Sequence, residues 1–254
     1  MSGYGITDES SSDCLCIGFS GIEMASSYFK IGNLQGWSAS ISNDMSRFKG
    51  PLGGLYDKYF RKSGISPNNK KFLIVGLGNI GEEYKNTRHN IGFDIVDQLG
   101  VILKGIFNSA KYGDILKSKY AGKQLVLLKP NTFMNLSGKA VVYWLKKEKI
   151  HINNLIVVVD DLNINFGKSR LKASGSDGGH NGLKDIANSL NTSNFTRLRF
   201  GIGNNFKKKD QVDFVLSKWN NEESTNLGHL IDKNVEIIFS SIKQGLDFTM
   251  NKYN

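Results

Sequence analysis

The sequence predicts an α/β fold with a largely parallel sheet, because buried strands alternate with amphipathic helices along residues 71–254. The runs FLIVG (72–76), QLVLL (124–128) and LIVVVD (155–160) are continuously apolar and rich in β-branched residues. Such runs are typical of strands that are buried on both faces. A fourth run, RLRFGIG (197–203), alternates apolar and basic residues, which predicts a strand with one solvated face and a mixed sheet.

Helical patterns lie between and after these strands. An apolar residue at every fourth position from 91 to 99 predicts the first helix, which Gly100 would end. Ser137 and Asn181 are the predicted N-caps of the second and third helices. Apolar residues at helical spacing from about 221 to 250 predict that the tail of the chain is helical too.

The first 70 residues differ in composition from the rest of the chain. They are rich in Ser, Gly and Asn, which predicts an N-terminal extension that is weakly ordered or only partly packed. Residues 1–70 carry 7 Lys/Arg and 6 Asp/Glu, whereas residues 71–254 carry 26 and 17. The basic body indicates a polyanionic partner such as nucleic acid, although a basic surface that only keeps the protein soluble fits the charge equally well.

Composition also indicates the compartment. Cys14 and Cys16 are too close for an ordinary disulfide and too few for a disulfide framework, which favours a reducing environment. No apolar run approaches the ~18 residues that span a bilayer, and no secretory signal opens the chain. We therefore expect a cytoplasmic protein without membrane attachment. If translation began at Met24, the Ser-rich basic stretch after it would look more like an organellar targeting peptide.

The stretch GLGNIG (76–81) follows a buried strand, as a dinucleotide-binding loop would. However, the polar run EEYKNTRHN (82–90) delays the next helix to about residue 91, and no acid closes a second strand some 20 residues onward. A P-loop is excluded because no Gly-Lys-Ser/Thr follows. The loop therefore predicts a tight turn that presents polar side chains, and no nucleotide cofactor is expected. Asn79 taken alone could serve only the turn itself.

Polar residues follow four strand or loop ends. In open α/β sheets, ligands bind beyond the carboxyl ends of the strands, so these residues can converge on one site. They are Asn79 and His89, Met134 and Asn135, Asp160, and His180 and Asn181.

His89 and Asp160 form the chemically informative pair. A carboxylate that accepts a hydrogen bond from one imidazole nitrogen raises the basicity of the other, which makes a general base. The chain has no Gly-x-Ser-x-Gly elbow, and both cysteines lie in the extension, so attack by water is favoured over a protein nucleophile. Asn79, Asn135 and Asn181 offer neutral amide donors that suit a carbonyl and its oxyanion.

Other interpretations of these residues stay open. His89, His180 and Asp160 could bind a metal ion, but no two of them have the close spacing of familiar metal motifs, so no metal is predicted. His180 could equally be a packing or capping residue. The residues by themselves therefore predict a basic α/β hydrolase that uses water and leave the scissile bond unnamed.

The sequence resembles the bacterial-type peptidyl-tRNA hydrolase family in five motifs, which occur in the family's order. They are FLIVGLGNIGEEYKNTRHNIGF, LLKPNTFMNLSGKAV, VVVDDLNINFG, GSDGGHNGLKDI and RLRFGIG. The resemblance covers residues 71–254, which would be the catalytic domain, and leaves residues 1–70 unexplained. It implies a single compact domain with a twisted mixed sheet flanked by helices. It also implies hydrolysis of the ester bond between peptide and tRNA, which recycles tRNA for translation; we expect a monomer without metal or cofactor.

The resemblance implies catalytic roles for five residues. His89 matches the base that activates water, and Asp160 matches the acid that orients it. Asn79 and Asn135 match amides that hold the substrate and stabilise the oxyanion. Asn181 matches the asparagine that positions water and the peptide backbone.

The resemblance also implies binding roles. Tyr84 and Met134 match residues that line the cleft for the peptide and the terminal adenosine. Lys172 and Arg199 match the basic surface that meets tRNA phosphate, and Arg170 matches it less closely.

The chain departs from the family pattern at several positions. Ile80 stands where proline is common, and Val159 and Asp177 stand where histidines are frequent. Asn165-Phe166 replaces a turn that contains proline. None of these removes a named catalytic group, so we expect the rate rather than the reaction to differ. The competing hypothesis is an RNA-binding protein with an organellar or splicing role, on the same scaffold, whose catalysis is incidental.

Overall fold

The computed structural model describes residues 70–254. The predictions for the N-terminal extension, its cysteines and a start at Met24 therefore lie outside the described residues. Within the described part of the chain, no helix is both long enough and apolar enough to cross a membrane.

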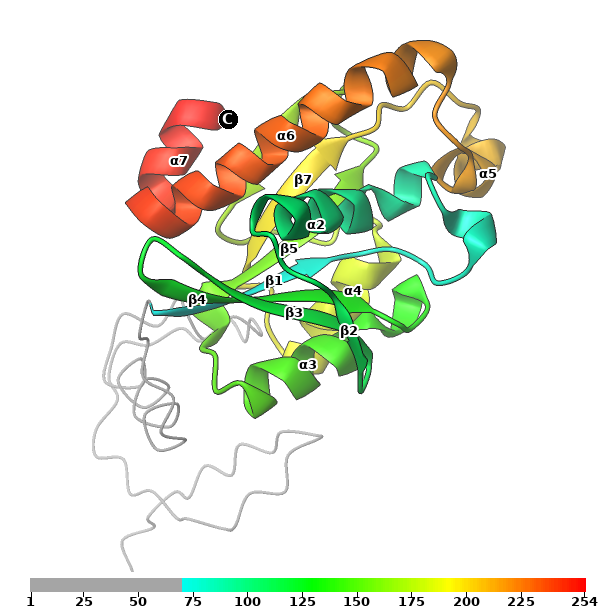
Figure 1. The fold of residues 1–254 in the computed structure, drawn as a ribbon. Helices are drawn as coiled ribbons and strands as arrows, with labels where there is room; N and C mark the ends of the chain where they lie inside the picture. The colour runs from blue at the N-terminus through cyan, green and yellow to red at the C-terminus, as the bar shows by residue number, and fades with distance from the viewer. Residues whose placement is uncertain (1–69) are drawn as a thin grey trace, which may run out of the picture. The chain divides into compact units, whose positions relative to one another are not determined.

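A single seven-stranded sheet forms the centre of the fold (Figure 1). Its strands are β1 (Lys71–Gly76), β2 (Asn108–Ala110), β3 (Gly113–Tyr120), β4 (Lys123–Pro130), β5 (Leu155–Asp161), β6 (Ser169–Lys172) and β7 (Thr196–Gly201). Their order across the sheet is β2-β3-β4-β1-β5-β7-β6. The four central strands are parallel, whereas β3 and β6 pair with their inner neighbours in antiparallel fashion. The prediction of a mixed, largely parallel sheet is confirmed.

Helices cover both faces of this sheet. The α-helices are α2 (Ile91–Ile102), α3 (Ser137–Lys147), α4 (Asn181–Leu190), α5 (Gln211–Leu216), α6 (Asn221–Gln244) and α7 (Leu246–Tyr253). Short 3₁₀ turns are η2 (Glu82–Tyr84), η3 (Arg88–Asn90), η4 (Met134–Leu136), η5 (Ile152–Asn154) and η6 (Lys208–Asp210). Figure 1 shows α2, α6 and α7 on one side of the sheet and α3 with α4 on the other.

The apolar runs of the central strands are explained by this three-layer arrangement. Along β1, Phe72 and Ile74 pack with α2 and α6 in one core, while Leu73 and Val75 pack with α3 and α4 in the other. Because side chains alternate between the two faces of a strand, a doubly covered strand is apolar along most of its length.

Several predicted helix ends are wrong, each for a local reason. α2 continues past Gly100 to Ile102, because the left-handed residue that reverses the chain is Lys104, with a φ of 52°. Ser137 is the first residue of α3 and does not cap it; its hydroxyl donates to the Met134 carbonyl at 2.9 Å. The tail forms two helices, because Gly245 breaks it with a φ of 97°.

The predicted solvated face of the 197–203 strand is found at Arg199, whose side chain is 24% exposed, and is wrong at Arg197. Arg197 is only 1% exposed. Its guanidinium donates to the carbonyls of Gly175 (2.7 Å), Ser176 (2.9 Å) and Ser193 (2.7 Å). These hydrogen bonds offset the cost of burying the charge. Arg197 therefore anchors the glycine-rich segment that runs toward α4.

Candidate active site

A cleft of about 350 Å³ lies where the predicted polar residues meet. Its walls come from the loops after β1, β4 and β5, the start of α4, and α5. The lining includes Asn79, His89, Met134, Asn135, Asp160, Asp177, His180, Asn181 and Arg199. The predicted convergence of polar side chains from different strand ends is confirmed.

Two glycines bring His89 to this cleft. A Cβ atom on Gly92 would lie 2.5 Å from the backbone N and O of Leu77 and 2.6 Å from the Val158 carbonyl oxygen. A Cβ atom on Gly76 would lie 2.2 Å from the Gly92 carbonyl oxygen. Real side chains do not tolerate such contacts, so both positions require glycine. The glycine pattern thus lets α2 begin directly against the sheet, immediately after His89.

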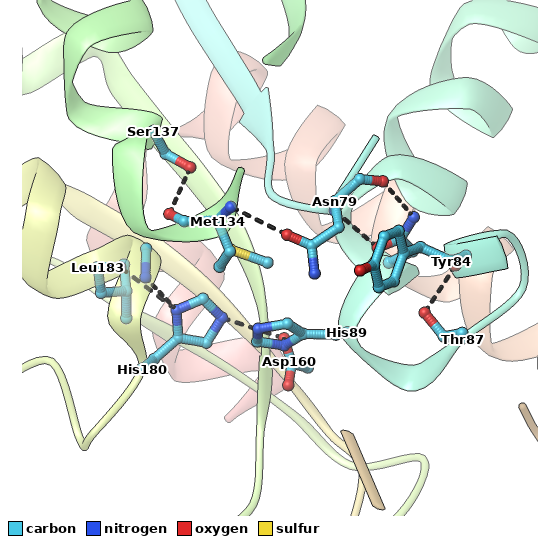
Figure 2. A network of polar contacts seen from close by, with 11 residues as sticks. Asn79, Tyr84, Thr87, His89, Met134, Ser137, Asp160, His180 and Leu183 are labelled. Atoms are coloured by element: carbon cyan, nitrogen blue, oxygen red, sulfur yellow. Dashed lines mark hydrogen bonds and ion pairs between the residues drawn. The ribbon is translucent and has the colours of Figure 1, made fainter. Parts of the chain in front are cut away.

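Asn79 is held in one orientation by two neighbours. The side chain of Asn90 accepts from the Asn79 backbone N–H at 2.8 Å and donates to the Asn79 carbonyl at 2.9 Å. The Asn79 side-chain oxygen accepts the Met134 backbone N–H at 2.9 Å (Figure 2). Its NH₂ group has no partner among residues 70–254 and can donate into the cleft. Asn90 was not among the predicted site residues, although it directly follows His89 in the RHN turn.

His89 and Asp160 are in direct contact, as predicted. His89 Nδ1 lies 2.8 Å from Asp160 Oδ1, and the two side chains are 13% and 3% exposed. Because a carboxylate only accepts hydrogen bonds, His89 Nδ1 carries the proton and Nε2 keeps its lone pair. Burial lowers the pKa of His89, but the charge of Asp160 and its hydrogen bond outweigh burial and raise that pKa above its ordinary value.

The same carboxylate oxygen accepts a second imidazole. His180 Nε2 lies 3.1 Å from Asp160 Oδ1 (Figure 2). Its Nδ1 accepts the backbone N–H groups of Gly182 (3.1 Å) and Leu183 (3.3 Å). His180 is therefore the N-cap of α4, in place of the predicted Asn181. Burial would raise the pKa of Asp160, but His89 and His180 beside it lower that pKa below its ordinary value.

Metal binding at these three residues conflicts with their hydrogen bonds. Donor atoms of His89, Asp160 and His180 lie within 4.8 Å of one another, which is close enough to surround an ion. A metal ligand nitrogen must be unprotonated. His180 Nδ1 already accepts two N–H groups, so its proton is on Nε2, the nitrogen that faces Asp160. The arrangement fits a carboxylate that orients two imidazoles better than it fits a metal centre.

The other predicted site residues fall into two groups. Asn135 and Asn181 line the cleft with exposed side chains, and Met134 lines it while being 5% exposed. Tyr84 lies in η2, is half-buried and is not part of the cleft lining. The roles assigned to all four stay predictions.

The predicted tRNA-binding residues lie on neighbouring strands. Arg199 lines the cleft and forms an ion pair with Asp161. Arg170 is the register partner of Arg199 across β6 and β7, and Lys172 lies two residues further along β6. Arg170 and Lys172 are exposed and lie outside the cleft lining.

The unusual residues differ in their access to the cleft. Ile80 is 39% exposed beside Asn79, and Val159 is buried in β5. Asp177 lines the cleft, where its side chain accepts the Gly179 backbone N–H at 2.8 Å. Of these three positions, only Asp177 adds a charge to the cleft.

Comparisons with known proteins agree on one family for residues 73–254. Residues 73–254 match the family described as Peptidyl-tRNA hydrolase. The peptidyl-tRNA hydrolases of Phocaeicola vulgatus and Parabacteroides distasonis are 50% and 52% identical to the chain over 184 residues, which is 72% of this chain and 98% of each relative. The crystal structure of peptidyl-tRNA hydrolase from Acinetobacter baumannii matches with a TM-score of 0.70 and 36% identity, over 74% of this chain and 97% of that one. Residues 9–80 match a family of unknown function, DUF5767.

Proposed function

The chain belongs to the peptidyl-tRNA hydrolase family and hydrolyses the ester bond of peptidyl-tRNA, and we propose that His89 drives this reaction by activating water. The observation that carries the proposal is the 2.8 Å contact between His89 Nδ1 and Asp160 Oδ1 at the wall of the cleft. It leaves Nε2 as an oriented base, which is worth about 10²–10⁴-fold in rate.

The proposed reaction has two steps. His89 Nε2 takes a proton from water while the water oxygen forms a bond to the ester carbon, which produces a tetrahedral oxyanion. The bond between this carbon and the ribose oxygen then breaks, and His89 returns the proton to that oxygen. The products are a peptide with a free carboxyl group and a tRNA with a free 3′ hydroxyl, ready for reuse in translation. Asp160 stabilises the imidazolium between the steps.

Amide groups would stabilise the oxyanion. The orientation of Asn79, fixed by Met134 and Asn90, supports a role for its NH₂ group as a donor. Asn135 would add a second donor, and Asn181 would position the water and the peptide backbone. Losing one such donor typically costs about 10²–10³-fold in rate.

The remaining assignments extend this proposal to the substrate and the state of the enzyme. Met134 and Tyr84 would contact the peptide and the terminal adenosine. Arg199, Lys172 and Arg170 would meet tRNA phosphate, which agrees with the excess of Lys/Arg in residues 71–254. We propose a cytoplasmic monomer that needs no metal; light scattering in solution tests the monomer, and full activity after chelator treatment tests the metal.

The decisive experiment uses an N-blocked aminoacyl-tRNA such as diacetyl-lysyl-tRNA. We expect the protein to release free tRNA, and we expect His89→Ala to lose nearly all activity while it still binds tRNA. Persistent hydrolysis by His89→Ala would reject the assigned base. The competing RNA-binding hypothesis is not favoured, because a binding module has no need of an imidazole oriented by a buried carboxylate.

A further inference from the structure

Arg88, the residue before His89, is buried and highly connected. Its side chain is 6% exposed. Nη1 donates to the hydroxyl of Ser217 and to the carbonyl of Lys218 at 2.7 Å, and Nη2 forms an ion pair with Glu223. These partners lie 129 to 135 residues away in sequence. One guanidinium therefore joins the turn that carries His89 to the junction between α5 and α6.

The backbone and two aromatic rings strengthen this connection. The Arg88 N–H donates to the Ser217 carbonyl at 3.1 Å, and Thr87 forms a bridge with Lys218. The guanidinium carbon lies 4.5 Å from the ring centre of Phe214 and 5.3 Å from that of Trp219. Arg88 is thus enclosed by the segment that runs from the end of α5 to the start of α6.

Glu223 connects the guanidinium to the start of α6. Its carboxylate accepts the Asn220 backbone N–H at 2.9 Å, and its own N–H donates to the Asn220 side chain at 2.8 Å. This reciprocal capping box fixes the first turn of α6. The carboxylate therefore binds Arg88 and the helix start at once.

α5 forms a wall of the cleft and has little stability of its own. It has only six residues, and isolated helices of this length do not persist in water. Gln211, Val212, Val215 and Leu216 from this helix line the cleft that also contains His89. The position of this wall relative to His89 therefore depends on contacts outside the helix, and Arg88 makes several of them.

We infer that Arg88 is a positioning residue that holds the α5 wall of the cleft at a fixed distance from His89 and thereby governs substrate binding. The inference rests on the proposed function, since it places peptidyl-tRNA in this cleft. Arg88 points away from the reacting atoms toward Ser217 and Glu223, so its loss should loosen the wall without removing the base. If a residue supports substrate binding equally in the ground state and the transition state, its removal raises KM and leaves kcat unaltered.

The test measures kcat and KM separately with diacetyl-lysyl-tRNA. For Arg88→Ala we expect KM to rise about tenfold while kcat stays within about twofold. Arg88→Lys should restore KM only in part, because an ammonium group cannot reproduce the forked hydrogen bonds of guanidinium. Glu223→Gln should raise KM about threefold, since it keeps the shape but loses the charge of the partner. The pH dependence set by His89 should stay unchanged in all three variants.

Glu148→Gln is the matched control. Glu148 is a carboxylate that is 8% exposed and pairs with Lys71 and Lys117. Lys71 begins β1, whereas the cleft lies beyond the other end of that strand. We expect this variant to lose thermal stability and keep the KM of the unaltered protein, which separates general destabilisation from movement of the wall.

Other outcomes would overturn the inference. An unchanged KM in Arg88→Ala, or an equal rise in Glu148→Gln, would make Arg88 a purely structural residue. A fall in kcat at constant KM would mean that Arg88 acts on the base. If Arg88→Ala does not fold, Glu223→Gln decides in the same way, because it leaves the guanidinium in place. Full activity of His89→Ala would reject the proposed base and leave this comparison of KM values intact.

Discussion

Two glycine-rich loops of the molecule, residues 76–92 and residues 175–182, each present a histidine to the same oxygen of Asp160. The two histidines differ in what the second ring nitrogen does. His89 donates from Nδ1 and keeps Nε2 without a protein partner among the described residues. His180 donates from Nε2 and uses Nδ1 to cap α4. The same residue type thus serves as a candidate base in one loop and as a structural group in the other.

The comparison teaches that the hydrogen bonds of the remote nitrogen decide the role of an imidazole. A base needs one unprotonated nitrogen that points at substrate. In His180 that nitrogen accepts two backbone N–H groups, so it cannot take a proton from water without breaking the N-cap of α4.

The glycines of the two loops also have different structural roles. Gly92 allows close packing of α2 on the sheet, whereas Gly178 and Gly179 adopt positive φ values of 61° and 82° in an exposed turn.

The largest expected effect is the difference in activity between His89→Ala and His180→Ala. Removing the base should cost up to about 10⁴-fold in kcat. Removing His180 leaves the base and its tautomer in place, so we expect a loss of about tenfold or less. Single-turnover hydrolysis of diacetyl-lysyl-tRNA measures both. Equal losses would mean that the two imidazoles act as one unit and that His180 is more than a structural group.

A second prediction concerns Asp160→Asn, which removes the acceptor shared by both loops. The introduced amide can donate to His89 Nδ1 and move the proton to Nε2, so we expect a loss of at least about 10²-fold. The pH dependence should shift as well. Asp160 raises the pKa of His89 against the lowering effect of burial; without the carboxylate that pKa falls. The rising limb of the kcat/KM profile, where His89 loses its proton, should therefore move to lower pH.

The pH profile of Asp160→Asn is best compared with that of Asn79→Ala. The latter variant should lose rate through the missing amide donor, and its limb should stay in place because the contact between His89 and Asp160 is untouched. A limb that moves to higher pH in Asp160→Asn would contradict the electrostatic account of this site.

The third prediction is a change in stability that belongs to the 175–182 loop alone. His180→Ala removes the acceptor for two N–H groups at the start of α4, so the free energy of unfolding should fall by about 1 kcal/mol. Asparagine is among the best N-cap residues, and His180→Asn should recover most of this loss. Thermal unfolding of the two variants provides the measurement. Equal destabilisation by both would show that capping is not what His180 contributes.

Sequence patterns predicted the central strands and the meeting of polar side chains beyond their carboxyl ends. The central strands were readable because strands covered on both faces are apolar along most of their length, and the contact between His89 and Asp160 followed from where strand ends meet. The edge strands β2 and β6, and β3 beside β2, were missed, because NSA, SRLK and GDILKSKY contain polar residues and lack a continuous apolar run. The burial of Arg197 could not be foreseen, since its acceptors are carbonyls on loops that no periodicity describes.

The residues that fix the positions of the cleft walls could not be predicted for a related reason. Arg88 and Glu223 are 135 residues apart, and each alone is compatible with an ordinary surface charge. Only the fold brings them together. Asn90 lies beside a predicted catalytic residue, yet its use as a clamp on the Asn79 backbone depends on the path of the turn. The contact between His89 and Asp160 follows from where parallel strand ends meet, whereas no such rule of topology or sequence pattern predicts the contacts of Arg88 and Asn90.

The smallest expected effect distinguishes the loops by charge. The 175–182 loop is flanked by Lys172 and Arg170 on β6, whereas the 76–92 loop carries Glu82 and Lys85 as an exposed pair at 3.5 Å. If tRNA phosphate lies along β6, Lys172→Gln should weaken tRNA binding a few-fold at low salt. It should also reduce the slope of the log binding constant against log salt concentration by about one. Lys85→Gln, the matched loss of one exposed charge, should leave that slope unchanged. Each phosphate contact releases counterions and so contributes to this slope. The same slope in both variants would therefore mean that Lys172 does not contact phosphate and that the phosphate contacts lie elsewhere.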